Sequence, residues 1–256
     1  GEIEVIAVLD GYWPPTNELI DDPRVVYLHF GQSGGMRNGI NSAASIAKGE
    51  YLMKSDAHCM FDEGFDLKLK EHIPEYVNDD GDDNWIVIPR RLRLDAENWV
   101  LQETEKPPVD YEFLSSPADA GIKGNKWNQR TVERMDILVD ETMSFQGSCW
   151  FMQKSWFEYL ELMDEETYGT FWNEFQEIGL KGWLSGGRIV VNKNAYYAHW
   201  HKTKSRGYNL PAGEKEKTQK MVEKWLSRGK TWHKQVHDVN WLVRKFSPVP
   251  TWQEHI

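Results

Sequence analysis

Four residues of the types that bind divalent metals occur as two short groups far apart in the chain. Asp56 and His58 stand two apart after a predicted strand, and His199 and His201 stand two apart in the strand-like segment 195–200 and just beyond it. Residues two apart on a strand point to the same face, so each group can direct its side chains together. Mixed oxygen and nitrogen ligands suit a divalent transition metal such as Mn2+, and Mg2+ less well. A lone histidine is more often a structural residue, but two groups favour a metal site.

The elements that must position these groups alternate between strands and helices. The apolar run 3–9 predicts a buried strand of a parallel sheet, which ends at Asp10. Open α/β sheets bind their ligands at such carboxyl ends. Gly34 and Gly35 open a predicted helix, where free N–H groups could face a phosphate. The other predicted strands are 25–30, 51–54, 85–89, 145–152, 188–191 and 195–200. The predicted helices are 36–48, 155–163, 171–184, 214–227 and a last stretch to about 246. Gly49 is the expected C-cap of the first helix, and Gly186 and Gly187 are expected to end the third.

Two polar segments show no such pattern. The acidic segment 78–84 lacks the spacing of a calcium-binding loop, and we expect a solvated connection there. The segment 92–140 is irregular, polar and proline-bearing, which predicts a long insertion on the acceptor side of the site.

Composition places the chain among globular proteins. Charged residues make up 27% and hydrophobic residues 40% of the 256 residues. No apolar run approaches the roughly 20 residues that span a bilayer, and no signal peptide opens the chain. Cys59 and Cys149 are too few for a disulfide framework. These features predict no membrane association and a cytoplasmic location, which would be the host cytoplasm for a viral protein.

The charge is distributed unevenly. The segment 201–256 carries 12 Lys and Arg against 5 Asp and Glu, whereas the whole chain has a net charge of −10. This basic segment could meet the phosphates of a ligand, a nucleic acid, or the acidic body of the same protein.

Several ordered motifs carry a family resemblance. The segment 33–59, with Met36–Ile40, an alanine-rich helix and Lys48–Tyr51, resembles the nucleotide-sugar-binding core of family 2 glycosyltransferases with the GT-A fold. The ending Asp56-Ala57-His58-Cys59 is closer to the polypeptide N-acetylgalactosaminyltransferases, which use Asp-x-His. The segments 147–151, 173–178 and 181–187 are similar to further motifs of that group. The resemblance covers about residues 3–208.

The resemblance implies a fold and a set of functional residues. The expected fold is α/β, with a Rossmann-like central mixed sheet flanked by helices and a basic helical C-terminal segment. It implies that Asp56, His58 and His199 hold Mn2+ or Mg2+, which bridges the diphosphate of a UDP-sugar donor. Glu174 is expected to be the acidic residue beside the sugar and the acceptor hydroxyl, although a first-turn helical Glu is the simpler explanation.

The remaining implied residues would bind the donor. Asp10 would contact the base or ribose, and Arg37 would lie near phosphate. Lys202, Lys204, Arg206 and Tyr208 stand where such enzymes have a mobile lid, which would close over the diphosphate and exclude water. The other residues expected to line the donor pocket are Gly35, Asn38, Ser55 and Trp150.

The sequence departs from the family pattern in two places. It begins at what would be the second strand, so we expect another segment or chain to supply part of the base-binding wall. Inverting family 2 enzymes carry a Glu-Asp pair, but here Phe175 follows Glu174. This departure favours a retaining mechanism.

The predicted organisation is a GT-A catalytic domain at 1–200 and a lid with a helical extension at 201–256. The expected function is metal-dependent sugar transfer to a hydroxyl of a macromolecular acceptor. Ser or Thr of a polypeptide follows from the resemblance, and a hydroxymethylated DNA base, as modified by compact phage glycosyltransferases, would explain the basic segment. A polysaccharide acceptor, or a non-catalytic nucleotide-sugar or carbohydrate-binding module, are the alternatives.

Overall fold

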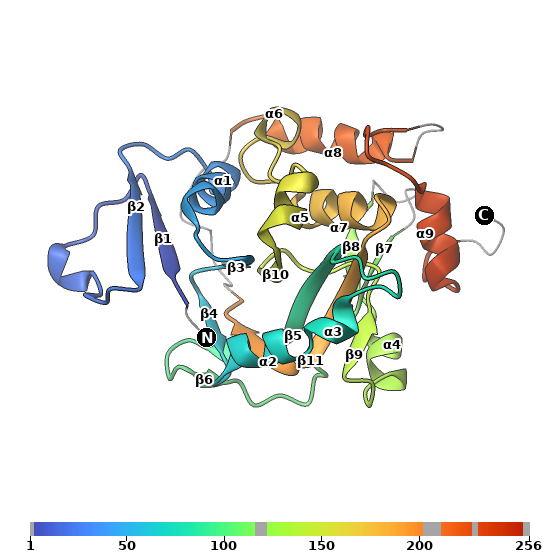
Figure 1. Ribbon diagram of the computed structural model, residues 1–256, viewed down its shortest axis with the longest axis horizontal. Coiled ribbons are helices and arrows are strands. Elements are labelled where there is room, and N and C mark those ends of the chain that lie inside the picture. Colours follow the sequence, from blue (N-terminus) through green and yellow to red (C-terminus); the bar gives the residue numbers. More distant parts are fainter. Residues whose placement is uncertain (1–2, 116–121, 202–210, 227–229, 253–256) are drawn as a thin grey trace.

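The computed structural model describes residues 3–115, 122–201, 211–226 and 230–252. Its centre is a mixed sheet with helices on both sides (Figure 1). The strands are β1 (Val5–Asp10), β2 (Val25–Phe30), β3 (Tyr51–Ser55), β4 (Cys59–Phe61), β5 (Trp85–Asp95), β6 (Val100–Leu101), β7 (Glu112–Leu114), β8 (Gly124–Lys126), β9 (Val139–Glu141), β10 (Cys149–Gln153) and β11 (Arg188–His199). The helices are η1 (Thr16–Glu18), α1 (Met36–Ile46), α2 (Phe65–Glu71), α3 (Ile73–Tyr76), α4 (Asn128–Glu133), α5 (Lys154–Tyr159), α6 (Glu165–Tyr168), α7 (Glu174–Leu184), α8 (Glu214–Lys224) and α9 (Val239–Phe246).

The seven-stranded sheet has the order β3-β10-β5-β11-β4, with β6 added to β5 and β9 added to β11. Strand β11 runs parallel to β5 and antiparallel to β4, and β10 runs antiparallel to both of its neighbours. The carboxyl ends of β3 and β11 and the turn before β4 therefore meet at one region of the sheet. This arrangement brings Asp56 and His199 together from distant parts of the chain.

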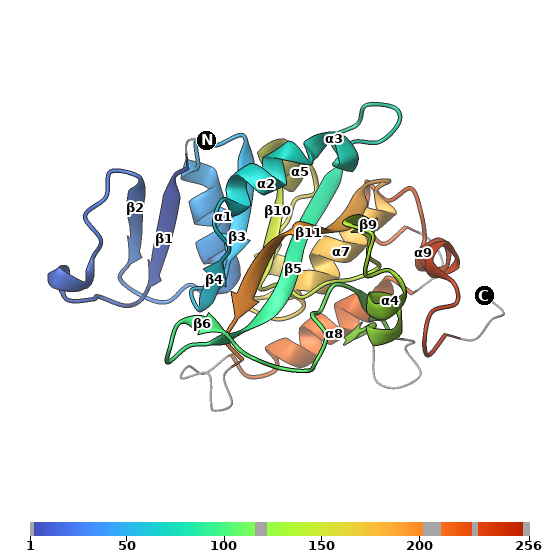
Figure 2. The ribbon, with the colours of Figure 1, turned by 90° about the horizontal axis from the view of Figure 1, so that it is seen from below.

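Helices cover both faces of this sheet. Helices α5 and α7 lie on one side of the strands, and α2 and α3 lie on the other (Figures 1 and 2). Ile178, Leu180, Trp183 and Leu184 of α7 are almost fully buried. Burying one such side chain contributes about 1.5–3 kcal/mol, so α7 is anchored by its apolar residues. The helix begins at Glu174 because Asn173 adopts a left-handed φ of 58°, and it ends before Gly186, whose φ is 86°, as predicted.

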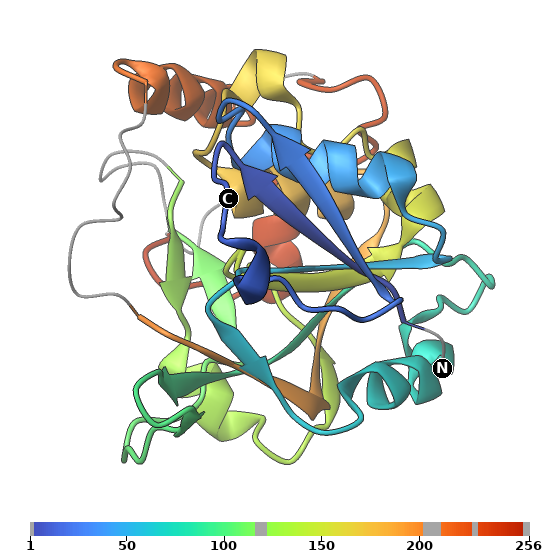
Figure 3. The same cartoon turned by 90° about the vertical axis from the view of Figure 1, so that its left-hand side faces the viewer.

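The first two strands lie apart from the large sheet. Strands β1 and β2 pair in parallel as a separate two-stranded sheet, seen at the front of Figure 3. Among the described residues, no strand pairs between β1 and β3. The predicted strand at 3–9 and its parallel pairing are confirmed by β1, but its predicted burial was wrong, since Val5 is 49% exposed and no residue of β1 is fully buried. An apolar run alone does not show whether both faces of a strand are covered.

Helix α1 connects this small sheet to the large one. A Cβ at Gly39 would lie 3.3 Å from a methyl group of Val8, so the absence of a side chain lets α1 pack closely on β1. The helix ends at Ile46, with Ala47 in an extended conformation. The prediction of Gly49 as its C-cap was therefore wrong by two residues.

The strand predicted in two pieces at 188–191 and 195–200 is the single strand β11. Its register with β5 shifts between Asn192 and Tyr196, opposite Pro89. Proline has no N–H to donate, so the ladder is interrupted there and β11 takes up the extra residues as a bulge. Lys193 of this bulge is buried and donates to the hydroxyl of Tyr111. The polar interruption in the sequence therefore reflects a bulge and not a loop.

The segment 92–140 is more regular than predicted. Strand β5 continues to Asp95, beyond the predicted end at Pro89. β6 extends the sheet, and β7 and β8 form a two-stranded antiparallel sheet followed by α4. Short strands between prolines and charged residues gave no clear alternating pattern, which is why the sequence suggested irregular structure.

The described part of the basic C-terminal segment packs on the body of the protein. Helix α8 contacts α6, and α9 contacts α7. Lys234 forms an ion pair with Glu161 (2.8 Å) and Lys245 forms one with Glu141 (2.8 Å). Part of the basic charge of this segment is therefore paired with carboxylates of the same protein, which is one of the three explanations that the sequence left open. No helix within the described ranges has the length and apolar character needed to cross a membrane.

Candidate metal and donor site

The three predicted metal ligands lie together at the end of the central sheet. The Nε2 atom of His199 is 3.3 Å from Oδ2 of Asp56, and the Nε2 atom of His58 is 3.9 Å from the same oxygen. One ligand atom from each of the three residues lies within 4.8 Å of the others. The sequence therefore predicted this convergence correctly, and the metal-binding role remains a prediction.

The backbone that holds these ligands differs from the expected one. Strand β3 ends at Ser55, so Asp56 and His58 lie on the turn to β4 and not on a strand. The N–H of Asp56 donates to the carbonyl of Ser148, and the N–H of Trp200 donates to the carbonyl of His58. A hydrogen-bonded turn, and not strand alternation, directs the two side chains to one place.

The chemistry of the cluster fits a divalent cation. Burial alone would raise the pKa of Asp56, but a hydrogen bond from His199 and the ammonium of Lys54 lower it to about 2. The carboxylate is therefore charged at neutral pH. The Nδ1 atom of His199 is buried and makes no hydrogen bond within the described part of the chain, so its Nε2 is the ring nitrogen directed at the cluster. One anionic oxygen and two imidazole nitrogens match the ligand preferences of Mn2+ and similar cations.

His201 does not complete this group. Its ring lies 4.8 Å from that of His199 between centroids, but it follows the end of β11 and is not among the three residues that converge. Burial, and then the neighbouring His199, lower the pKa of His201 to about 4, so its imidazole is neutral at neutral pH.

A buried lysine that the sequence analysis missed connects the site. The Nζ atom of Lys54 lies 2.8 Å from Oδ1 of Asp56 and 3.2 Å from Oε1 of Glu174, and it donates to the carbonyl of Gly147 (2.5 Å). Burial alone would lower the pKa of Lys54, but the carboxylates of Glu174 and Asp56 raise it to about 12. Lys54 therefore stays charged and leaves Oδ2 of Asp56 facing the histidines. The signal in the sequence was a single charge at the end of an otherwise apolar strand.

Glu174 is held behind this cluster. Its carboxylate contacts Lys54 and accepts a hydrogen bond from the indole of Trp150 (3.3 Å). A Cβ at Gly147 would lie only 2.7 Å from Oε2 of Glu174, so any larger residue there would displace this carboxylate. Burial raises the pKa of Glu174, and Lys54 opposes the shift. Glu174 is therefore not only the first residue of a helix, because Lys54 forms ion pairs with both Glu174 and Asp56.

The glycine turn near the donor side is closed by Asp10. Its carboxylate accepts hydrogen bonds from the hydroxyl of Ser33 (2.8 Å) and from the N–H groups of Gly34 (2.7 Å) and Gly35 (2.9 Å). The expectation that these N–H groups are free for a phosphate was wrong. Asp10 stabilises the turn that leads into α1, and the sequence did not show that pairing because the partners are 24 residues apart.

Arg37 is not placed to contact a diphosphate. Its side chain is fully buried, pairs with Glu177, donates to the carbonyl of Trp172 (2.8 Å) and lies over the ring of Tyr168. Glu177 also pairs with Lys181 (2.8 Å). The prediction of a phosphate contact is corrected: the guanidinium joins α1 to α7. The spacing of Glu177 and Lys181 was visible in the sequence, but their burial was not.

The other predicted donor residues fall into two groups. Asn38 is partly buried on the first turn of α1, Ser55 is exposed beside Asp56, and Trp150 is almost fully buried against Glu174. Lys202, Lys204, Arg206 and Tyr208, which were predicted to form the lid, lie outside the described residues.

Comparison with known proteins decides the family. Residues 1–160 match the family described as Glycosyl transferase family 2. The chain belongs to this family. It is 24% identical over 196 residues to polypeptide N-acetylgalactosaminyltransferase 12 of Mus musculus, a match that covers 72% of this chain and 30% of the mouse protein. The chain therefore spans less than a third of that relative.

A solved structure supports the fold. The crystal structure of GalNAc-T7 with UDP, GalNAc and Mn2+ superposes with a TM-score of 0.66 at 16% sequence identity, covering 88% of this chain and 42% of that one. The expected GT-A fold is confirmed, with its central mixed sheet between helices. The resemblance to polypeptide N-acetylgalactosaminyltransferases is likewise found in both sequence and structure.

Proposed function

We propose that this family 2 chain is a metal-dependent glycosyltransferase that transfers a sugar from a UDP-sugar to a hydroxyl of a macromolecular acceptor. The convergence of Asp56, His58 and His199 carries the proposal. UDP and Mn2+ in the GalNAc-T7 crystal structure support this donor and this metal. Residues 1–200 would form the catalytic unit, and residues 201–256 the lid and extension.

The ligands would act as a charged, preformed group. Asp56 is ionised at neutral pH, and Lys54 holds one of its oxygens so that the other faces His58 and His199. A bound divalent cation would neutralise negative charge on the diphosphate leaving group. Fixed ligand geometry lowers the reorganisation needed when the donor binds.

Glu174 would be the acidic residue of the site. Lys54 and Trp150 fix its carboxylate, and only 8% of the residue is exposed. Ser55 and Asn38 are the accessible candidates for donor contacts among the described residues. Phe175 in place of an aspartate supports retention of configuration.

For the acceptor, Ser or Thr of a polypeptide is the leading candidate. The name of the mouse relative supports it, whereas the ion pairs of Lys234 and Lys245 with the protein's own carboxylates reduce the charge free to bind DNA. Binding of hydroxymethylated DNA should weaken steeply as salt rises, and binding of a peptide should not. Mass spectrometry of both acceptors after incubation with UDP-sugars separates the two outcomes.

The activity itself is tested by hydrolysis of a panel of UDP-sugars with Mn2+. We expect hydrolysis of at least one donor, and we expect Asp56→Ala and His199→Ala to abolish it. If every donor stays intact while the protein binds UDP, the chain is a non-catalytic nucleotide-sugar-binding module. Elongation of an oligosaccharide acceptor alone would indicate a polysaccharide-building enzyme.

A further inference from the structure

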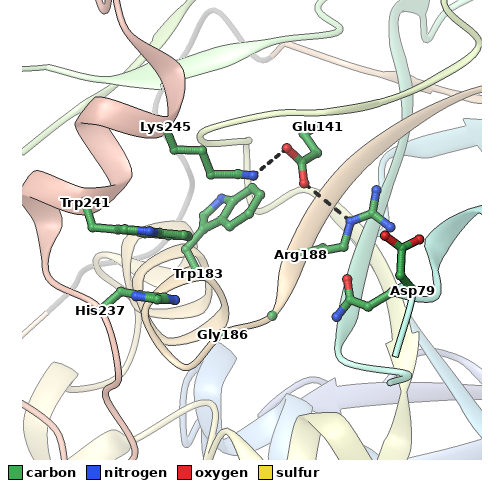
Figure 4. A pocket seen from close by; sticks show the side chains of 10 residues that line it. Asp79, Glu141, Trp183, Gly186, Arg188, His237, Trp241 and Lys245 are labelled. Atoms are coloured by element: carbon green, nitrogen blue, oxygen red, sulfur yellow. Dashed lines mark hydrogen bonds and ion pairs between the residues drawn. The ribbon is translucent and has the colours of Figure 1, made fainter. Parts of the chain in front are cut away.

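A second candidate site lies at the other end of β11. A cavity of about 330 Å³ opens beside Arg188, the first residue of this strand, whereas His199 is its last residue (Figure 4). Arg188 pairs with Trp85 and His199 with Arg93 on β5, so the two ends of β11 are roughly 26 Å apart at 3.3 Å per residue. A molecule in this cavity therefore cannot reach the metal cluster. The lining residues are Asn78, Asp79, Glu141, Trp183, Gly186, Gly187, Arg188, His237, Trp241 and Lys245.

One wall of this cavity is aromatic. The rings of His237 and Trp241 stack with centroids 3.8 Å apart and an angle of 6° between their planes, and Trp183 stands beside them (Figure 4). Lys245 lies over the ring of Trp183 at 5.1 Å. The indole of Trp183 donates to the carbonyl of Thr142 (3.2 Å), which fixes its orientation. This wall is therefore held in place without a ligand.

The opposite wall is polar. Arg188 donates to the carbonyl of Tyr76 (3.1 Å) and so holds the loop that carries Asn78 and Asp79. Neither of these two side chains hydrogen-bonds to another of the described residues, and Asp79 is exposed. The cavity therefore offers an amide and a carboxylate that a ligand can use.

The charges of the cavity balance. Glu141 pairs with both Arg188 (3.4 Å) and Lys245 (2.8 Å), so neither cation is free to bind an anion. The unpaired carboxylate of Asp79 would repel a phosphate. A neutral ligand with several hydroxyl groups fits better, because its hydroxyls can donate to Asp79 and its C–H faces can lie against the partly exposed ring of Trp241.

We propose that this cavity binds a neutral sugar unit of a glycan. The volume lies at the lower end of the range for small-molecule sites, which suits one or two sugar rings. Asp79 and Asn78 would accept and donate hydrogen bonds to the hydroxyls, and Trp241 would contact the ring. This binding is independent of the transfer reaction, since no residue of the cavity belongs to the metal cluster.

The test follows the indole N–H signals in 1H–15N spectra of the intact chain. Methyl glycosides of glucose, galactose, N-acetylglucosamine and N-acetylgalactosamine are titrated separately, with inorganic phosphate as a further ligand. Trp241→Phe identifies the signal of Trp241. We expect at least one glycoside to shift this signal saturably in the millimolar range. Asp79→Ala should weaken that binding about threefold to tenfold through the lost hydrogen bond.

Three variants separate the possible outcomes. Asp82→Ala removes the same charge from the same exposed loop and should leave sugar binding unchanged. Trp99→Ala, at a tryptophan that is 53% exposed elsewhere, should also leave it unchanged. Asp56→Ala should keep sugar binding even where it abolishes transfer, so the two proposals fail separately. The sugar site is disproved if no glycoside shifts the Trp241 signal, if phosphate binds more tightly than every glycoside, or if Asp79→Ala has no greater effect than Asp82→Ala.

Discussion

The Nε2 atom of His199 lies 3.3 Å from Oδ2 of Asp56, although 143 residues separate them in the chain. The contact exists because the end of β11 pairs with β4, immediately after the turn that carries Asp56 and His58. Lys54 pairs with the other carboxylate oxygen of Asp56 at 2.8 Å. The ligand group is therefore oriented by protein contacts alone.

Lys54 is expected to be essential for stability as well as for the site. Lys54→Met would leave Glu174 buried without its counter-charge, and breaking such a buried pair costs about 3–5 kcal/mol. Urea unfolding measures the loss. The double variant Lys54→Met/Glu174→Gln should recover part of it, because the uncompensated charge is gone. A loss below about 1 kcal/mol in the single variant would show that Lys54 is not a buried counter-ion.

The lowered pKa of Asp56 predicts that the stability of the fold depends on pH. Its pKa is lowered in the folded protein from 3.8 to about 2, so its stabilisation is present above pH 3.8 and is lost as the pH falls towards 2. The contribution is about 2 kcal/mol at neutral pH. The difference in unfolding free energy between wild type and Asp56→Asn, measured with EDTA present, should therefore shrink as the pH is lowered through this window. A difference that stays constant with pH would contradict the shift.

A substitution at Arg37 tests whether this side chain stabilises the fold or binds the donor. Arg37→Lys keeps the charge but loses the hydrogen bonds of the guanidinium to Glu177 and Trp172, so we expect a drop of about 1–3 kcal/mol in unfolding free energy. The affinity for UDP, measured by calorimetry at a temperature where the variant is folded, should stay within about twofold of wild type. Unchanged stability with an affinity loss of tenfold or more would restore the phosphate-contact role.

The convergence of Asp56, His58 and His199 and the fold class could be predicted because their signals are local. Asp56-Ala57-His58 and the histidines near residue 199 are short motifs, and the order of strands and helices follows apolar patterns of 4–12 residues. Even so, the turn at Asp56 and the bulge opposite Pro89 were not visible. Both depend on which strands become neighbours.

Roles that depend on burial could not be predicted. The family resemblance implied that Arg37 lies near phosphate, but its partner Glu177 is 140 residues away and is buried with it. The glycine N–H groups expected to face a phosphate are bonded to Asp10, 24 residues away. Lys54 was overlooked for the same reason, since its partner Glu174 is 120 residues away. Residue type alone does not distinguish a cation that binds phosphate from one that neutralises a buried carboxylate. The cavity beside Arg188 likewise assembles residues from four separate segments.

Direct measurement of Mn2+ binding tests the central claim most simply. Electron paramagnetic resonance of free Mn2+ during titration, with UDP present, should show one bound ion per wild-type chain. His199→Ala and Asp56→Ala should each weaken this binding at least about tenfold, whereas His201→Ala, which removes a neighbouring imidazole outside the cluster, should leave it unchanged. Equal Mn2+ affinity in wild type and His199→Ala would contradict the proposed metal site.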